Sequence, residues 1–219
     1  MSGRVGTNDL AAIGLGTNIM LPVFIFTTGV LLAITPMVSK ADGQKKPATI
    51  RLYLIQGLWL SIPLGIVSLI ILMNLSWLLD LLGLNPDVKQ LAEDYLFFIA
   101  FGMPGIALYQ ALRFFWEGLG KTLPTMWISF FALLINIPIN ALFIYGYGPI
   151  EARGAAGCGI ASSIVMWMMF FIGLVYVLKN QQLSDYLVPF NHFSISDFFV
   201  KWQHGIKPIL SLGLPNSFA

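Results

Sequence analysis

Charged side chains are scarce in this sequence of 219 residues. Asp, Glu, Lys and Arg make up 10% of it, against roughly 25% in an average soluble domain. Hydrophobic residues make up 57%, and the mean hydropathy is +0.80. Such a chain has too few charges to cover the surface of a soluble domain. The net charge of +2, with no basic run longer than Lys45–Lys46, also argues against a nucleic-acid partner.

Cysteine and catalytic motifs are scarce as well. The one cysteine, Cys158, cannot form an internal disulfide and has no metal-ligand companions in its neighbourhood. The sequence contains no Gly-rich phosphate loop and no nucleophile–base pair within an apolar run. The first ten residues lack the basic stretch and short apolar core of a cleavable signal peptide. We therefore expect neither an enzyme nor a resident cofactor.

Long apolar runs dominate the remainder. A helix needs about 20 predominantly apolar residues to cross the hydrocarbon core of a bilayer. Five runs meet this requirement, and a sixth begins at Pro208 and is not completed by Ala219. The sequence therefore predicts an all-α, polytopic membrane helix bundle over residues 1–178, with spans at about 11–39, 52–75, 95–116, 123–145 and 157–178.

The connections carry their own signals. Asn85 followed by Pro86 predicts a capped helix start. In the long loop 179–207, the segment ISDFFVKW alternates Phe and Trp with charges, which favours an interfacial helix. Trp77, Trp116 and Trp202 stand near predicted boundaries, as expected for an aromatic belt at the membrane surface.

The distribution of Lys and Arg predicts how the chain is threaded, because cytoplasmic loops accumulate basic residues. One set of alternate segments holds nine of them, and the other holds only Arg4, Lys89 and Arg153. This bias predicts that the residues before Ala11 are outside and that the loop 179–207 is cytoplasmic. A chain that starts outside and ends within an apolar run is most simply explained as part of a longer protein. The alternative is a natural product of this length that inserts with its short N-terminus translocated.

The stretch LLINIPINALFIYG (residues 133–146) is unusual for a membrane span. Asn136 and Asn140 are one helical turn apart and share a face, about 20 and 26 Å from Leu123 along the helix. Pro138, between them, removes an N–H and is expected to kink the helix beside the amides. Two interpretations stay open: the asparagines hold helices together, or they form part of a cation or substrate site.

Other polar residues leave similar alternatives. Arg113 and Glu117, at positions i and i+4 of the third span, are expected to form an ion pair near its inner end. Five polar residues of the first span either line a wet face or only satisfy packing: Thr17, Asn18, Thr27, Thr28 and Thr35. No Asp or Glu lies well inside any predicted span, although coupling to protons or sodium normally requires an ionisable membrane residue.

Six segments taken in order resemble the multidrug and toxic compound extrusion (MATE) family, and most closely its NorM-like bacterial branch. They are GRVGTNDLAAIGLG (Gly3–Gly16), ITPMVSKADGQKK (Ile34–Lys46), AEDYLFFIAFGMPG (Ala92–Gly105), FFWEGLGKTLPTM (Phe114–Met126), NIPINALFIYG (Asn136–Gly146) and GAAGCGIASS (Gly154–Ser163). The resemblance covers nearly the whole chain. The succession of EGLGKTLPTM, NIPIN and GAAGCG is its most specific part.

The resemblance implies a twelve-helix antiporter with two six-helix lobes, located in the bacterial inner membrane. It would export cationic, often aromatic drugs in exchange for sodium ions or protons. The spans here would be helices two to six of the first lobe, followed by the start of helix seven. The first helix, which carries a carboxylate in the family, and the second lobe would be missing partners.

The resemblance also implies a site. Asn136, Asn140 and Ser162 would line the cavity of the first lobe, with sodium coordination by the two amides where sodium is the coupling ion. A chain without the carboxylate and the second lobe is expected to be inactive alone. Two alternatives are a non-transporting remnant or half-transporter subunit and, less favoured because Arg113 is the only nearby cation, a lipid-linked oligosaccharide flippase.

Overall fold

The computed structural model describes residues 6–146, 151–184, 186 and 206–217, and this part of the chain is helical and contains no strand. Its helices are α1 (Thr7–Leu32), α2 (Ile34–Gly43), α3 (Pro47–Met73), α4 (Ser76–Leu81), α5 (Pro86–Ala100), α6 (Met103–Gly118), α7 (Leu123–Tyr145), α8 (Gly154–Lys179), α9 (Gln181–Ser184) and α11 (Ile206–Ser217). Prolines begin several of them. Pro47 and Pro86 occupy first-turn positions, where the missing N–H has no helical partner to lose.

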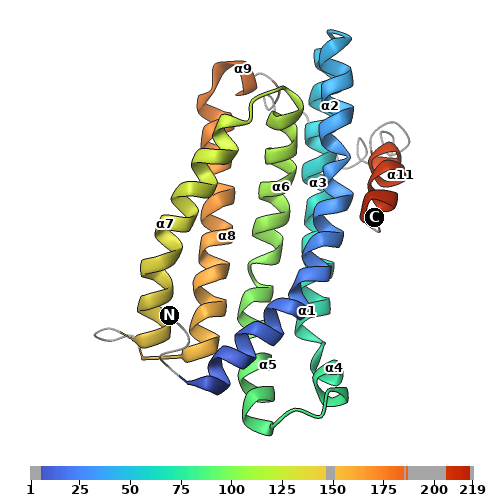
Figure 1. Ribbon diagram of the computed structural model, residues 1–219. Helices are drawn as coiled ribbons and strands as arrows, with labels where there is room; N and C mark the ends of the chain where they lie inside the picture. The colour runs from blue at the N-terminus through green and yellow to red at the C-terminus, as the bar shows by residue number, and fades with distance from the viewer. Residues whose placement is uncertain (1–5, 147–150, 185, 187–205, 218–219) are drawn as a thin grey trace.

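The helices form one elongated bundle (Figure 1). At one edge α7 lies against α8, which also packs on α5 and α6, and α6 packs on α3. The in-line pair α1–α2 and helix α11 complete the opposite edge, where α11 packs on α1. Four helical segments of the described chain are long and apolar enough to cross a membrane, or five if the bent pair α5–α6 is one span. The predicted polytopic helix bundle is confirmed.

The third span differs from its prediction. Residues 95–116 were expected to form one span, but α5 and α6 meet at a bend of 45°. Pro104 has no N–H to continue the hydrogen-bond ladder, and Gly102 lets α8 come close, since a Cβ on it would lie 2.9 Å from the Cα of Ser163. Gly65 of α3 accommodates the other side of the bend, where its Cβ would lie 2.6 Å from the Cα of Pro104. Hydropathy contains no information on such close contacts between helices, so it could not predict the bend.

The other boundaries lie close to their predictions. The first span reaches from Thr7 to Gly43 with a turn at Ala33, and α3 and α8 begin at Pro47 and Gly154, a few residues before their apolar runs. The run 123–145 coincides with α7. Within the loop 179–207 the structure describes α9, whereas the predicted interfacial helix and Trp202 lie outside the described residues.

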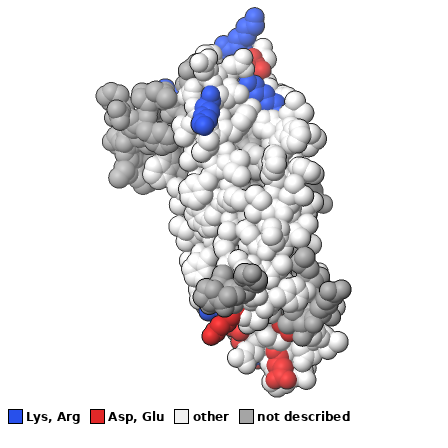
Figure 2. Space-filling model, turned by 90° about the vertical axis from the view of Figure 1, so that its left-hand side faces the viewer, with Lys and Arg blue, Asp and Glu red and all other residues white. Residues whose placement is uncertain are grey.

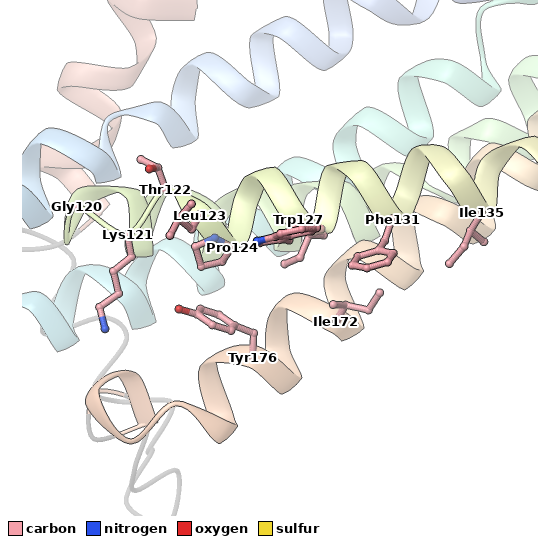
Figure 3. Close-up of a pocket in the computed structure, with 11 residues that line it drawn as sticks. Gly120, Lys121, Thr122, Leu123, Pro124, Trp127, Phe131, Ile135, Ile172 and Tyr176 are labelled. Atoms are coloured by element: carbon pink, nitrogen blue, oxygen red, sulfur yellow. The ribbon is translucent and has the colours of Figure 1, made fainter.

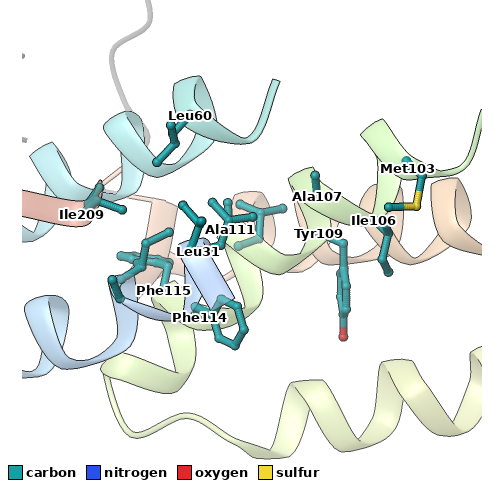
Figure 4. Close-up of a cluster of buried hydrophobic side chains, with 14 of the residues drawn as sticks. Leu31, Leu60, Met103, Ile106, Ala107, Tyr109, Ala111, Phe114, Phe115 and Ile209 are labelled. Carbon is teal, nitrogen blue, oxygen red and sulfur yellow. The ribbon is translucent and has the colours of Figure 1, made fainter. Parts of the chain in front are cut away.

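Trp116 corrects the predicted aromatic belt. Its side chain is fully buried, with an exposed fraction of 0%, whereas Trp77 is 60% exposed. The indole Nε1 of Trp116 donates a hydrogen bond to Thr125 Oγ1 at 2.8 Å, and its ring meets Tyr109 edge-on at 6.1 Å. Trp116 thus belongs to the apolar core of α6, part of which is shown in Figure 4 with Phe115 and Leu31.

The predicted start of α5 is confirmed. Asn85 is the N-cap residue, and its Oδ1 accepts a hydrogen bond from the backbone N–H of Asp87 at 3.1 Å. Asn85→Ala leaves this donor without its partner and is expected to lower the free energy of unfolding by about 1 kcal/mol. The thermal midpoint of the purified protein in detergent measures the effect. Asn85→Asp keeps an acceptor and serves as the control, so equal midpoints for the two variants would contradict the prediction.

Candidate functional site

The two asparagines of α7 lie on one face of a continuous helix. α7 starts after the α6–α7 turn, where Gly120 has a φ of 75°. The helix α7 contains no charged residue. The Nδ2 of Asn140 donates a hydrogen bond to the Oδ1 of Asn136 at 2.7 Å. This bond confirms the prediction that the two asparagines share a face. The helix continues through Pro138, and the predicted kink stays a prediction.

The bond between the asparagines stays within α7 and leaves one acceptor unused. Both side chains are half-buried. The Oδ1 of Asn140 is buried and has no hydrogen-bond partner among the described residues. A buried polar atom without a partner is costly, so this oxygen stands out as an available ligand atom. Nothing in the described contacts uses the pair to join α7 to a neighbouring helix.

The polar residues of α1 and α2 behave differently, because they bond across helices. Thr17 lies 3.2 Å from the hydroxyl of Tyr95 on α5, and Thr27 lies 2.8 Å from Ser68 Oγ on α3. The hydroxyl of Thr35 donates to the backbone carbonyl of Phe114 on α6 at 3.2 Å. Of the two interpretations of the first span, the structure supports packing for these three threonines.

Helix α6 contributes polar groups that the sequence did not single out as site residues. The Nε2 of Gln110 donates to Thr28 Oγ1 at 3.2 Å, while its Oε1 is buried without a partner in the described structure. Tyr109 points from α6 towards α7 (Figure 4), and its hydroxyl lies beside Ser129. On α3, Gln56 is buried with its Oε1 likewise unpaired. The available signal was that polar side chains stand within apolar runs at these positions.

Ser162 is half-buried on α8 and interacts with Cys158, one turn earlier on the same helix. No hydrogen bond joins Ser162 to either asparagine in the part of the chain that the structure describes. Close contact between α7 and α8 occurs near the pair, because a Cβ on Gly157 would lie 2.2 Å from the carbonyl oxygen of Phe143. A cavity role for Ser162 stays a prediction.

The predicted ion pair between Arg113 and Glu117 is present, but it lies in a different part of the bundle from the two asparagines. Arg113 Nε donates to Glu117 Oε1 at 2.8 Å, and the same oxygen accepts from the Thr125 hydroxyl at 2.9 Å. These bonds attach the end of α6 to the first turn of α7. Asn136 lies eleven positions after Thr125, about 16 Å further along the helix. The ion pair thus stabilises the α6–α7 turn rather than the amide pair.

Metal binding by carboxylate, imidazole or thiolate clusters finds no support in the described residues, where no group of three or more His, Cys, Asp or Glu is close enough together. Four uncharged oxygens are buried without a hydrogen-bond partner in this part of the chain, those of Gln56, Tyr109, Gln110 and Asn140, and the three amide oxygens among them suit a hard cation. Of these, Asn140 belongs to the predicted site.

Fold and site together define a multi-pass α-helical membrane protein with an uncharged amide pair deep in an apolar helix. The chain belongs to the MATE family, because the family model described as MatE matches residues 1–142. It is similar to multidrug resistance protein MdtK of Photorhabdus laumondii, with 40% identity over 220 residues. It also matches a protein described as "Probable multidrug resistance protein NorM" of Acinetobacter baylyi, with 35% identity over 219 residues.

The matches cover all of this chain but 47% of each of these two relatives, so the chain spans about half their length. Solved structures show the same arrangement of helices. The eukaryotic MATE transporter AtDTX14 matches 99% of this chain with a TM-score of 0.86 at 20% identity, using 46% of its own length. A multidrug resistance MATE family transporter in its inward-facing conformation matches with a TM-score of 0.82 at 22% identity.

Proposed function

We propose that the chain forms most of one lobe of a secondary multidrug antiporter in the bacterial inner membrane. The proposed substrates are cationic, aromatic compounds, exported in exchange for sodium ions or protons. Family membership and the names of the bacterial relatives support this class of transport. The charge distribution supports the proposed orientation in the membrane. On the face shown in Figure 2, Lys and Arg gather at one end of the bundle and Asp and Glu mainly at the other, in keeping with a basic cytoplasmic end.

The unpaired Oδ1 of Asn140 carries the assignment of the site. An amide oxygen held in a low-dielectric environment is a hard ligand for a sodium ion and an acceptor for the N–H groups of an organic cation. Asn136 holds the Asn140 side chain in place through the 2.7 Å bond, so that the free oxygen has one orientation. Asn136 and Asn140 would thus bind and orient a cation.

The described helices do not supply the coupling charge at this depth. α7 has no charged residue, and the carboxylate of Asp9 at the start of α1 accepts a hydrogen bond from the backbone N–H of Ala155 at 2.9 Å. Alternating access also requires two lobes that move against each other. We therefore infer that transport needs a further helix with an ionisable group and a second lobe, and that this chain alone does not pump.

A chimera tests the proposal. The chain replaces the matching part of Photorhabdus laumondii MdtK, and efflux-deficient bacteria produce either this chimera or the 219-residue chain alone. We expect the chimera to extrude ethidium, a cationic aromatic dye, at least tenfold faster than the empty-vector control, and the chain alone to extrude none. Fluorescence decay after energising the cells measures efflux, with membrane levels matched by immunoblot.

The efflux results for the chimera and for the chain alone test separate parts of the proposal. A chimera that reaches the membrane and extrudes no dye would favour the non-transporting alternative. Efflux by the chain alone would overturn the inference that it requires a second lobe. Repeating the assay in the presence and absence of a sodium gradient identifies the coupling ion.

A further inference from the structure

A long groove runs between α7 and α8 on the outside of the bundle. Its volume is about 930 Å³, within the range of ligand-binding clefts. Gly120, Lys121 and Thr122 of the α6–α7 turn form one end of the groove (Figure 3). Trp127 and Phe131 of α7 face Ile172 and Tyr176 of α8 along its length.

The walls are apolar and exposed. Trp127 is 53% exposed, Phe131 48% and Ile172 38%, and the rings of Trp127 and Phe131 are stacked at 6.0 Å. Neither asparagine of the candidate site lines the groove. From Leu123 to Ile135 it follows about 18 Å of helix, comparable with one leaflet of a hydrocarbon core about 30 Å thick. The groove therefore matches the depth of an acyl chain.

Lys121 gives the groove one charged end. Its Nζ donates to Gln182 Oε1 at 2.5 Å, and this neutral acceptor leaves the charge uncompensated. No Asp or Glu in the described parts of the chain forms an ion pair with Lys121. A cationic drug would be repelled here, whereas an anionic group at the membrane surface would be attracted.

We propose that this groove binds one phospholipid with an anionic headgroup. The phosphate lies beside Lys121, and an acyl chain lies against Trp127, Phe131 and Ile172. The proposal commits to a lipid because the cation stands at the polar end of an apolar slot of leaflet depth. Neither a soluble anion nor a cationic substrate needs both features.

Quenching of Trp127 fluorescence by brominated lipids tests this proposal. The chain is reconstituted in phosphatidylcholine nanodiscs with increasing fractions of phosphatidylglycerol dibrominated on its acyl chains, and the difference between wild type and Trp127→Phe isolates the signal of Trp127. Brominated phosphatidylcholine is measured in parallel. We expect half-maximal quenching at about a fivefold lower fraction of phosphatidylglycerol, the factor that one lysine contributes near an anionic surface.

Lys121→Gln is expected to abolish this fivefold preference while leaving the helical circular dichroism unchanged. Lys40→Gln removes a charge from the same end of the bundle without lining the groove, and should leave the preference intact. Equal quenching by both lipids in wild type would mean unspecific lipid contact and overturn the proposal. Absence of quenching in the chimera described above would mean that polypeptide covers the groove and would overturn it too. Displacement of the quenching by ethidium would instead assign the groove to drugs.

Discussion

Gly157→Ala is expected to prevent α7 and α8 from packing and to remove most of the folded protein. A Cβ at this position would lie 2.2 Å from the carbonyl oxygen of Phe143 and 2.5 Å from its carbonyl carbon. These are backbone atoms and cannot rotate away. The same carbonyl accepts a hydrogen bond from the N–H of Arg153 at 3.1 Å, so separating the helices also breaks the closure of the α7–α8 loop. Membrane helices depend on such close contacts between small residues.

The expected loss is about 3 kcal/mol or more, the upper range for overpacking. The measurements are the yield of monodisperse protein in detergent and its thermal midpoint. Gly14→Ala is the matched control, because a Cβ there meets nothing within 4 Å. Gly16→Ala should fall between the two, since its Cβ would meet the side chain of Tyr95, which can shift. A Gly157→Ala protein as stable as Gly14→Ala would contradict the packing of α7 against α8.

Hydropathy was sufficient to predict a polytopic helix bundle and the approximate place of its long apolar helices, because burial in lipid requires long apolar runs. It could not predict the bend between α5 and α6, which depends on how Gly65 and Gly102 fit against Pro104 and Ser163. It also placed Trp116 at a membrane surface. The position of Trp116 in the core follows from Thr125, a partner on the next helix. Asn85, whose cap bond reaches only two residues ahead, was predictable from local sequence.

In the site, too, local geometry was predictable from the sequence, whereas contacts between distant residues were not. Helical geometry was sufficient to predict that Asn136 and Asn140 share a face, and the 2.7 Å bond between them confirms it. The sequence left open whether the hydroxyls of α1 hold helices together or line a wet face. The answer depends on partners that are 41 residues away for Thr27 and 78 for Thr17. The unpaired Oδ1 of Asn140 was likewise unpredictable, because it depends on whether a described neighbouring helix places a hydrogen-bond donor beside it.

Replacing Asn136 and Asn140 together by Leu in the MdtK chimera is expected to separate stability from transport. The double variant removes both partners of the 2.7 Å bond and the unpaired Oδ1. Exchanging a bonded polar pair for apolar groups of similar size is nearly neutral or stabilising. The thermal midpoint should therefore be unchanged or raised. Ethidium efflux should fall about 10- to 100-fold, the loss expected when hydrogen bonds or ion–dipole contacts to a charged ligand disappear.

The two interpretations of the asparagines give opposite results in this experiment. If the pair holds helices together, the midpoint falls, and efflux declines only in proportion to the amount of folded protein. If the pair binds a cation, efflux per folded molecule falls while the protein is as stable as before. Asn18→Leu serves as the control, because it exchanges an exposed amide of α1 for the same apolar side chain. Full efflux by a stable double variant would remove Asn136 and Asn140 from the transport site.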